Sequence, residues 1–229
     1  MWKEEYHVTS GSVRDFMYKV YGWMAVALGI TAGVAYYIAS NPVVFKTVIG
    51  SPLMFVLLIA QLGLVFFLSW RIQKMNFSTA LVSFLAYSAL SGVTFSVYFY
   101  IYTLASIYLA FAITAGTFLA MAIYGYFTKT DLTSMGGIVT MGLFGLIIAM
   151  FANMWFKSPV ADYYISLIAV GIFTLLTAYD VQKIKKIGQA VAGNPEAENK
   201  LAIIGSLTLY LDFINLFIHL LRLFGKRRN

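Results

Sequence analysis

Cysteine is absent from the 229-residue chain, and charged residues make up only 11% of it. Without cysteine, disulfide bonds and thiolate metal sites are excluded. The scarcity of charge excludes an ordinary soluble domain, because such domains carry about 25% charged and about 45–50% apolar residues. Here 61% of the residues are hydrophobic. So little polar surface could not cover so large an apolar core in water, and the sequence therefore predicts an integral membrane protein.

Motifs of common catalytic and cofactor sites are also missing. The chain contains no Gly-rich phosphate loop, nucleophile elbow or paired zinc-ligand helix. Its two histidines are too few for a specific transition-metal site. The Schiff base of retinal proteins needs a lysine in the last helix, and none lies between Leu201 and Leu221. We therefore expect neither an enzyme nor a protein with a bound cofactor.

Seven apolar segments approach the roughly 20 residues that a helix needs to cross the hydrocarbon core. They are Tyr21–Ala39, Pro52–Trp70, Thr79–Tyr102, Leu104–Phe127, Met135–Phe156, Tyr163–Asp180 and Leu201–Phe224. A polar tail (residues 1–20), a loop (residues 184–200) and a basic tail (residues 225–229) complete the chain. The prediction is an all-α, seven-helix membrane protein built as one polytopic domain.

The lysines and arginines predict the orientation, because cytoplasmic loops carry most of them. With the N-terminus in the cytoplasm, ten of these residues fall inside, and only Lys46 and Lys157 fall in outer loops. The net charge of +7 thus reflects topology rather than nucleic-acid binding. Arg222 and the basic tail conflict with this pattern. Either the last segment crosses completely and places them outside, or it re-enters and returns; we favour seven crossings.

Small residues spaced by four mark faces on which helices approach closely in lipid. Three such sets predict packing faces: Ala25, Gly29 and Gly33; Ala112, Gly116 and Ala120; and Ser88 with Gly92.

Two aspartates, Asp180 and Asp212, lie in or at the end of apolar segments. A carboxylate at the bilayer centre costs roughly 3 kcal/mol on insertion scales, so such residues face the interior of a helix bundle and function is the first hypothesis. The alternative is that each aspartate only caps a helix or pairs with Lys183, Arg71 or His219.

Asp212, Asn215, His219 and Arg222 fall on one helical face, within about 80° of one another. This polar seam predicts that the last helix is the most enclosed. If Asp180 and Asp212 meet, two charges about 4 Å apart would repel by roughly 4 kcal/mol at an effective dielectric near 20. The pair would then share one proton near neutral pH and act as a clamp between two helices.

The run Ser206–Phe217, read SLTLYLDFINLF, closely resembles the signature of the Bax inhibitor-1 family, also called the transmembrane Bax inhibitor motif family. The run Ala178–Ile184, read AYDVQKI, resembles its second aspartate motif. The resemblance implies six helices around a central C-terminal seventh, and a pH-sensitive calcium leak. The short chain is similar to bacterial members, which implies the bacterial inner membrane.

In the terms of that family, Asp180 and Asp212 match a di-aspartate pH sensor, and Arg71 lies near a basic position that can bond to it. Asn215 and His219 are further candidate gate partners. Gln61 stands near a carboxylate position of the second helix, which puts an ion-binding role of that helix in doubt. The expected partners are the lipid bilayer, calcium ions bound weakly by Asp180 and Asp212, and a membrane protein. We expect a monomer or weak oligomer.

The leading functional hypothesis is a proton-gated calcium leak. The first alternative is a regulator that binds a membrane protease or another membrane protein without ion flux. A proton-coupled transporter usually has internal repeats, and none is visible in the sequence. Intramembrane hydrolysis by the two aspartates is the most distant alternative.

Overall fold

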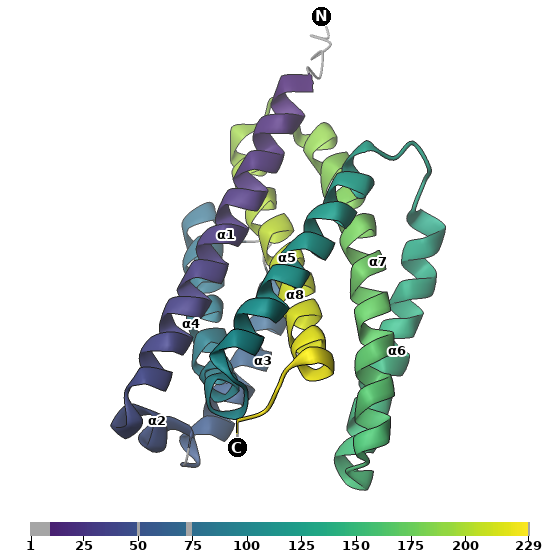
Figure 1. Cartoon of the computed structure of the whole chain (residues 1–229). Helices are drawn as coiled ribbons and strands as arrows, with labels where there is room; N and C mark the ends of the chain where they lie inside the picture. Colours follow the sequence, from purple (N-terminus) through teal and green to yellow (C-terminus); the bar gives the residue numbers. More distant parts are fainter. Residues whose placement is uncertain (1–9, 50, 72–74, 229) are drawn as a thin grey trace, which may run out of the picture. The chain divides into compact units, whose positions relative to one another are not determined.

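The structure, a computed structural model, describes residues 10–49, 51–71 and 75–228. The described residues form eight helices (Figure 1). They are α1 (Ser10–Ser40), α2 (Pro42–Ile49), α3 (Leu53–Arg71), α4 (Phe77–Ile101), α5 (Leu104–Phe127), α6 (Thr133–Phe156), α7 (Pro159–Val191) and α8 (Pro195–Phe224). The all-α prediction is confirmed for these residues.

Six of the described helices, α1 and α4 to α8, are long and apolar enough to cross a membrane. Helices α2 and α3 form a pair bent by 72° that adds a seventh span if it is counted as one. Helix α2 was not predicted. It begins with an Asn-Pro pair, in which Asn41 Oδ1 accepts hydrogen bonds from the amides of Val43 and Val44 at 3.2 and 3.3 Å. Asparagine at the N-cap and proline at the first helical position favour a helix start.

Three helix ends differ most from the predicted boundaries. Helix α1 begins at Ser10, inside the predicted polar tail, and α7 and α8 extend through most of residues 184–200. Only residues 192–194 connect α7 to α8, and Gly193 adopts a φ of 87° there. Asn194 then caps α8 by accepting a hydrogen bond from the Ala197 amide at 3.1 Å. Hydropathy identifies only the part of a helix that is apolar enough to face lipid. Helical turns made of polar residues are therefore missed when helix bounds are predicted from hydropathy.

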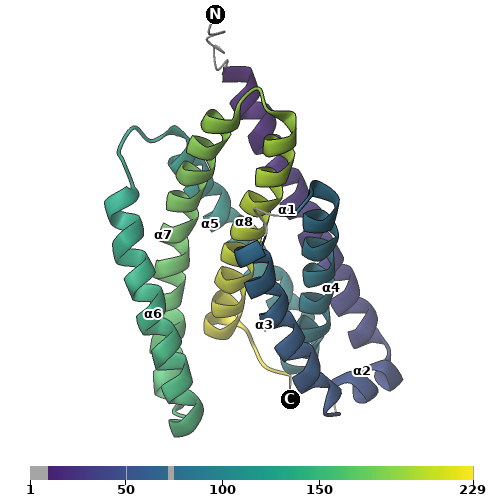
Figure 2. The same cartoon turned by 180° about the vertical axis from the view of Figure 1, so that it is seen from behind.

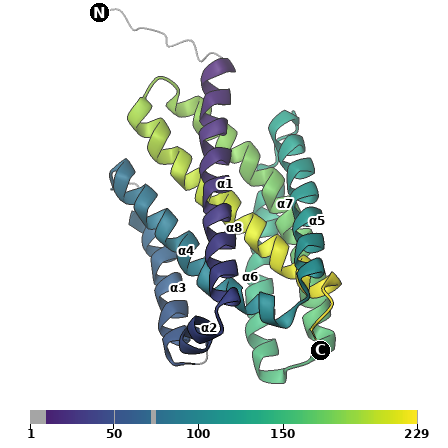
Figure 3. The same ribbon diagram turned by 60° about the vertical axis from the view of Figure 1, so that its left-hand side comes forward.

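The chain forms two compact units, and α7 and α8 run through both. The first unit contains the described chain up to Tyr100 and Ile184–Thr208. In it, α1 packs on α4, where Thr31 Oγ1 donates to the Ser88 carbonyl at 2.9 Å. Helix α1 also contacts the first half of α8, where Ser206 Oγ donates to the Val20 carbonyl at 2.8 Å. In Figure 3, α3 and α4 are seen next to one another, to the left of α1.

Of the three packing faces predicted from small residues, one is correct and two are wrong. Ser88 and Gly92 are buried, and a Cβ added at Gly92 would lie 2.7 Å from the Thr31 carbonyl oxygen. The residues of the other two sets are exposed, and a Cβ at Gly29, Gly33 or Gly116 would meet nothing within 4 Å. Spacing by four defines a face of a helix, but it does not reveal whether protein or lipid covers that face.

The second unit contains α5, α6, α7 up to Lys183, and α8 from Leu209. Helices α6 and α7 lie side by side (Figures 1 and 2). Its core joins α6, α7 and α8 through eight buried residues: Val139, Leu146, Ile165, Ala169, Phe173, Leu176, Leu216 and Leu220. Helix α8 has the largest buried share of the six single-helix spans, 67% of its apolar stretch against 44% or less in the others. Among these six spans the prediction that α8 is the most enclosed is confirmed, and an arrangement of six helices around a central α8 stays a prediction.

The C-terminal tail returns to the junction between α4 and α5. The Thr103 amide donates to the Lys226 carbonyl at 3.0 Å, and the Lys226 amide donates to Ser106 Oγ at 2.9 Å. The Arg228 amide donates to the Ile101 carbonyl at 2.8 Å. Four continuous helices separate the junction from the tail, and four crossings return a chain to its starting side. The contact is compatible with a full crossing by α8, which stays a prediction.

Gly125 of α5 provides a test of the helix packing. A Cβ at this position would clash with the backbone carbonyl of Ala178 in α7. We expect Gly125→Ala to lower the free energy of unfolding by about 1–3 kcal/mol, as overpacking does. The melting temperature of the purified protein in detergent measures the effect. Gly116→Ala on the same helix is the matched control, because its Cβ meets nothing within 4 Å; equal melting temperatures for the two variants would contradict the packing described.

Candidate functional site

Asp180 of α7 and Asp212 of α8 both lie in the second unit, and both are buried, with 8% and 5% of their surfaces exposed. Their carboxyl groups lie within hydrogen-bonding range of one another. A hydrogen bond between two carboxyl groups requires a proton on one of them. The geometry is therefore that of a carboxyl pair able to hold one shared proton between two helices.

Tight packing on both sides fixes the position of this pair. Two residues before Asp180, the carbonyl of Ala178 lies against Gly125 of α5. Next to Asp212, the ring of Phe213 contacts those of Phe111 and Phe118 of α5, with centroids 5.6 Å apart in each case. Because α5 contacts the chain beside each aspartate, α7 and α8 cannot shift there without disturbing α5.

One oxygen of the pair has no partner. In the described part of the chain, the buried Asp212 Oδ2 accepts no hydrogen bond. An unsatisfied buried acceptor costs about 1–3 kcal/mol, more when the group is charged. Among residues 10–49, 51–71 and 75–228, no group of three or more His, Cys, Asp or Glu residues could hold a metal ion. The pair can thus offer a cation few protein ligands.

Lys183, one turn after Asp180, is a cation that acts on the pair. It attracts Asp180 electrostatically, while its Nζ lies 5.8 Å from the centre of the Tyr179 ring. Lys183 is exposed. Asp180 therefore lies toward the lysine-bearing part of α7, and Asp212 is the more enclosed of the two carboxyl groups.

The residues of the predicted polar seam of α8 do not form a single site, because they contact different partners. Asn215 Nδ2 donates to the Leu211 carbonyl of its own helix at 2.8 Å. His219 Nδ1 lies 3.4 Å from Ser166 Oγ, and its ring stacks on Phe173 with centroids 6.2 Å apart. Seven residues of helix, about 10 Å, separate His219 from Asp212. Gate roles for Asn215 and His219 stay predictions, and the described contacts give both residues other partners.

Arg71 and Gln61 belong to the first unit. Arg71 ends α3 and is exposed. Gln61 Nε2 donates to Ser91 Oγ of α4 at 3.1 Å. A role for Arg71 beside the carboxyl pair, and any replacement of a functional carboxylate by Gln61, stay predictions.

Sequence reasoning missed two polar contacts. The buried side chain of Gln182 accepts from the Leu132 amide at 2.9 Å and donates to the Thr130 carbonyl at 2.8 Å, which fastens the loop between α5 and α6 to α7. Its place two residues after Asp180 in the AYDVQKI run was the available indication. Arg222 Nη1 pairs with Asp162 Oδ1 at 3.5 Å, and no local sequence pattern indicates this contact between residues 60 positions apart.

Comparison with known proteins agrees with the motifs. The family described as "Inhibitor of apoptosis-promoting Bax1" matches residues 13–229. The inner membrane protein YbhL of Escherichia coli K12 is 44% identical over 218 residues, which cover 94% of this chain and 93% of YbhL. An uncharacterized Borreliella burgdorferi protein is 47% identical over 215 residues, 93% of each chain. The uncharacterized protein YrjE of Lactococcus lactis is 38% identical over 219 residues, 94% of this chain and 92% of YrjE. With a family match over nearly the whole chain and relatives of this identity, the protein belongs to the Bax inhibitor-1 family of membrane proteins.

Proposed function

We propose that the protein is a passive, proton-gated cation leak of the bacterial inner membrane, with calcium as the permeating ion and the N-terminus in the cytoplasm. The observation that carries this proposal is the buried contact between the carboxyl groups of Asp180 and Asp212, which joins α7 to α8. A cation path that follows α8 would pass this pair, because α8 is the most buried of the spans.

Gating follows from the number of protons on the pair. With one or two protons bound, a hydrogen bond can join the carboxyl groups and hold α7 against α8. Loss of the last proton leaves two negative charges at hydrogen-bonding distance, which repel by roughly 4 kcal/mol at an effective dielectric near 20. That energy is sufficient to shift a two-state equilibrium about a thousandfold. Deprotonation therefore opens the leak, and acidification closes it.

The carboxylates of Asp180 and Asp212 would also supply oxygen ligands for the permeating calcium ion. Calcium prefers six to eight oxygen ligands, and the two carboxylates supply four at most. Asp212 Oδ2, which accepts no hydrogen bond in the described part of the chain, is free to contact a cation. So sparse a site binds calcium weakly, which suits a conducting path because an ion must leave as readily as it enters.

Calcium flux into liposomes that contain the purified full-length protein tests the gating. We expect flux to be several-fold larger at neutral than at acid pH. Asp212→Asn should give low flux at both, because asparagine cannot ionise and its amide can still donate a hydrogen bond to Asp180. Asp131→Asn in the exposed loop after α5 is the control and should keep the pH response.

An unchanged pH response in Asp212→Asn would contradict the gate. Absence of calcium flux in the unmodified protein at every pH would contradict the proposal that the protein is a cation leak. Combined with stable co-purification of a membrane protease or other membrane protein, that result would establish the regulator instead.

Calcium should also stabilise the protein in a pH-dependent manner. At a concentration tenfold above its dissociation constant, a ligand adds about 1.4 kcal/mol to the free energy of unfolding. We expect calcium to raise the melting temperature in detergent at neutral pH and much less at acid pH, because protons compete for the carboxylate ligands. Asp180→Asn and Asp212→Asn should remove most of this stabilisation, and Asp131→Asn should retain it. An equal calcium effect in all three variants would place calcium binding elsewhere.

A further inference from the structure

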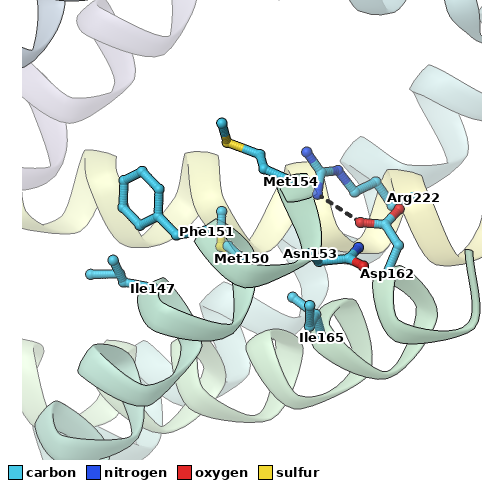
Figure 4. Close-up of a pocket in the computed structure, with 8 residues that line it drawn as sticks. All are labelled: Ile147, Met150, Phe151, Asn153, Met154, Asp162, Ile165 and Arg222. Atoms are coloured by element: carbon cyan, nitrogen blue, oxygen red, sulfur yellow. Dashed lines mark hydrogen bonds and ion pairs between the residues drawn. The ribbon is translucent and has the colours of Figure 1, made fainter. Parts of the chain in front are cut away.

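A cavity of about 430 Å³ opens where the end of α6, the start of α7 and the end of α8 meet in the second unit. Its volume falls within the range of ligand pockets, roughly 300–1,000 Å³. Figure 4 shows the Arg222–Asp162 ion pair beside Asn153, with apolar side chains of α6 further along the helix. The apolar lining from α6 consists of Ile147, Met150, Phe151 and Met154. The cavity therefore has a charged end and an apolar end.

A second cavity of about 460 Å³ shares Asn153, Asp162 and Arg222 with the first and adds Lys157 and Arg227. The two cavities together are lined by three cations and one carboxylate, a net charge of about two positive units. The N-terminus of the 33-residue helix α7 lies at the same place, since Ser158 and Pro159 line the second cavity. The helix dipole at such an end favours anions, although the Ala161 amide of this turn already donates to Ser158 Oγ at 3.2 Å and Asp162 lies in the same turn.

Most hydrogen-bond donors of the Arg222 guanidinium group are not used in the contacts found among the described residues. Only its Nη1 contacts Asp162, at 3.5 Å, which is long for a hydrogen bond. No other hydrogen bond of its guanidinium group is found among the described residues. A guanidinium carries five donors in a planar fork that matches the oxygens of a phosphate. The remaining donors can bind an anion while the contact with Asp162 persists.

Aromatic side chains place this site at the depth of lipid headgroups. Trp155 and Phe156 at the end of α6 are 86% and 81% exposed, and Tyr163 and Tyr164 near the start of α7 are 55% and 57% exposed. Trp and Tyr concentrate at the membrane–water interface. The charged end of the cavity therefore lies where lipid phosphates lie, and the apolar end along α6 lies where acyl chains begin.

We propose that this site binds an anionic phospholipid, with its phosphate held by Arg222, Lys157 and Arg227 and an acyl chain along the apolar residues of α6. Basic pockets between membrane helices bind anionic headgroups in this way. The net positive charge favours an anionic headgroup over a zwitterionic one. A free phosphate ion would satisfy the cations but leave the apolar end unfilled. The site is separate from the carboxyl pair, and the proposal does not depend on ion flux.

The test measures the melting temperature of the purified full-length protein in detergent while phosphatidylglycerol, phosphatidylcholine or inorganic phosphate is added. We expect a saturable rise with phosphatidylglycerol and little change with the other two. The double variant Lys157→Gln/Arg227→Gln should bind phosphatidylglycerol roughly 25-fold more weakly, because each cation near an anionic surface contributes about a fivefold factor. Both side chains are exposed, so this variant should fold even if Arg222→Gln does not.

Lys129→Gln is the matched control, since Lys129 is an exposed lysine of the loop between α5 and α6; it should keep the full response. Equal responses to phosphatidylglycerol and phosphatidylcholine would overturn the proposal. So would an unchanged affinity in the double variant. A rise with inorganic phosphate equal to that with the lipid would show a site for free phosphate and overturn the lipid assignment.

Discussion

The contact between two buried carboxyl groups is the constraint on which the second unit depends. Removal of a carboxyl group from water is costly unless it is neutral or paired. The pair meets this requirement chiefly by bringing Asp180 to Asp212, with Lys183 attracting Asp180 from one side. The packing around it is correspondingly close, since α5 lies against α7 at Gly125 and against α8 at Phe213. Under the proposed gating, a helix contact that depends on one proton needs surroundings that hold both side chains in place.

Helices α7 and α8 meet in two different polar contacts along their length. One is the pair of acidic groups, Asp180 and Asp212, and the other is the ion pair of Arg222 with Asp162. The carboxyl pair lies deep in the unit and toward the lysines of α7, where protons and cations are the available counter-charges. Arg222 and Asp162 lie near the helix ends flanked by exposed aromatic residues, where phosphate is abundant. If both proposals hold, one polar face of α8 has two functions, with Asp212 responding to acidity and Arg222 to lipid composition.

Hydropathy predicted the apolar helices well, because transfer to lipid depends on local composition alone. It also identified Asp180 and Asp212, since a carboxyl group in an apolar segment stands out in any sequence. It failed for α2, which starts through the Asn41 cap, and for the polar turns of α7 and α8. The exposed sets around Gly29 and Gly116 show a further limit, because periodicity defines a face without saying what covers it. The contact of Asp162 with Arg222, 60 residues away in the chain, depends on tertiary packing that no local pattern encodes.

The docking of the C-terminal tail bears on how the protein is made. The amides of Thr103 and Lys226 and the carbonyl of Ile101 complete their hydrogen bonds only when the tail reaches the junction before α5. Residues 225–228 follow the junction by four helices, α5 to α8, so they are synthesised long after α5. The hydrogen bonds of the junction therefore form only once α8 is in place, and the junction closes late in folding.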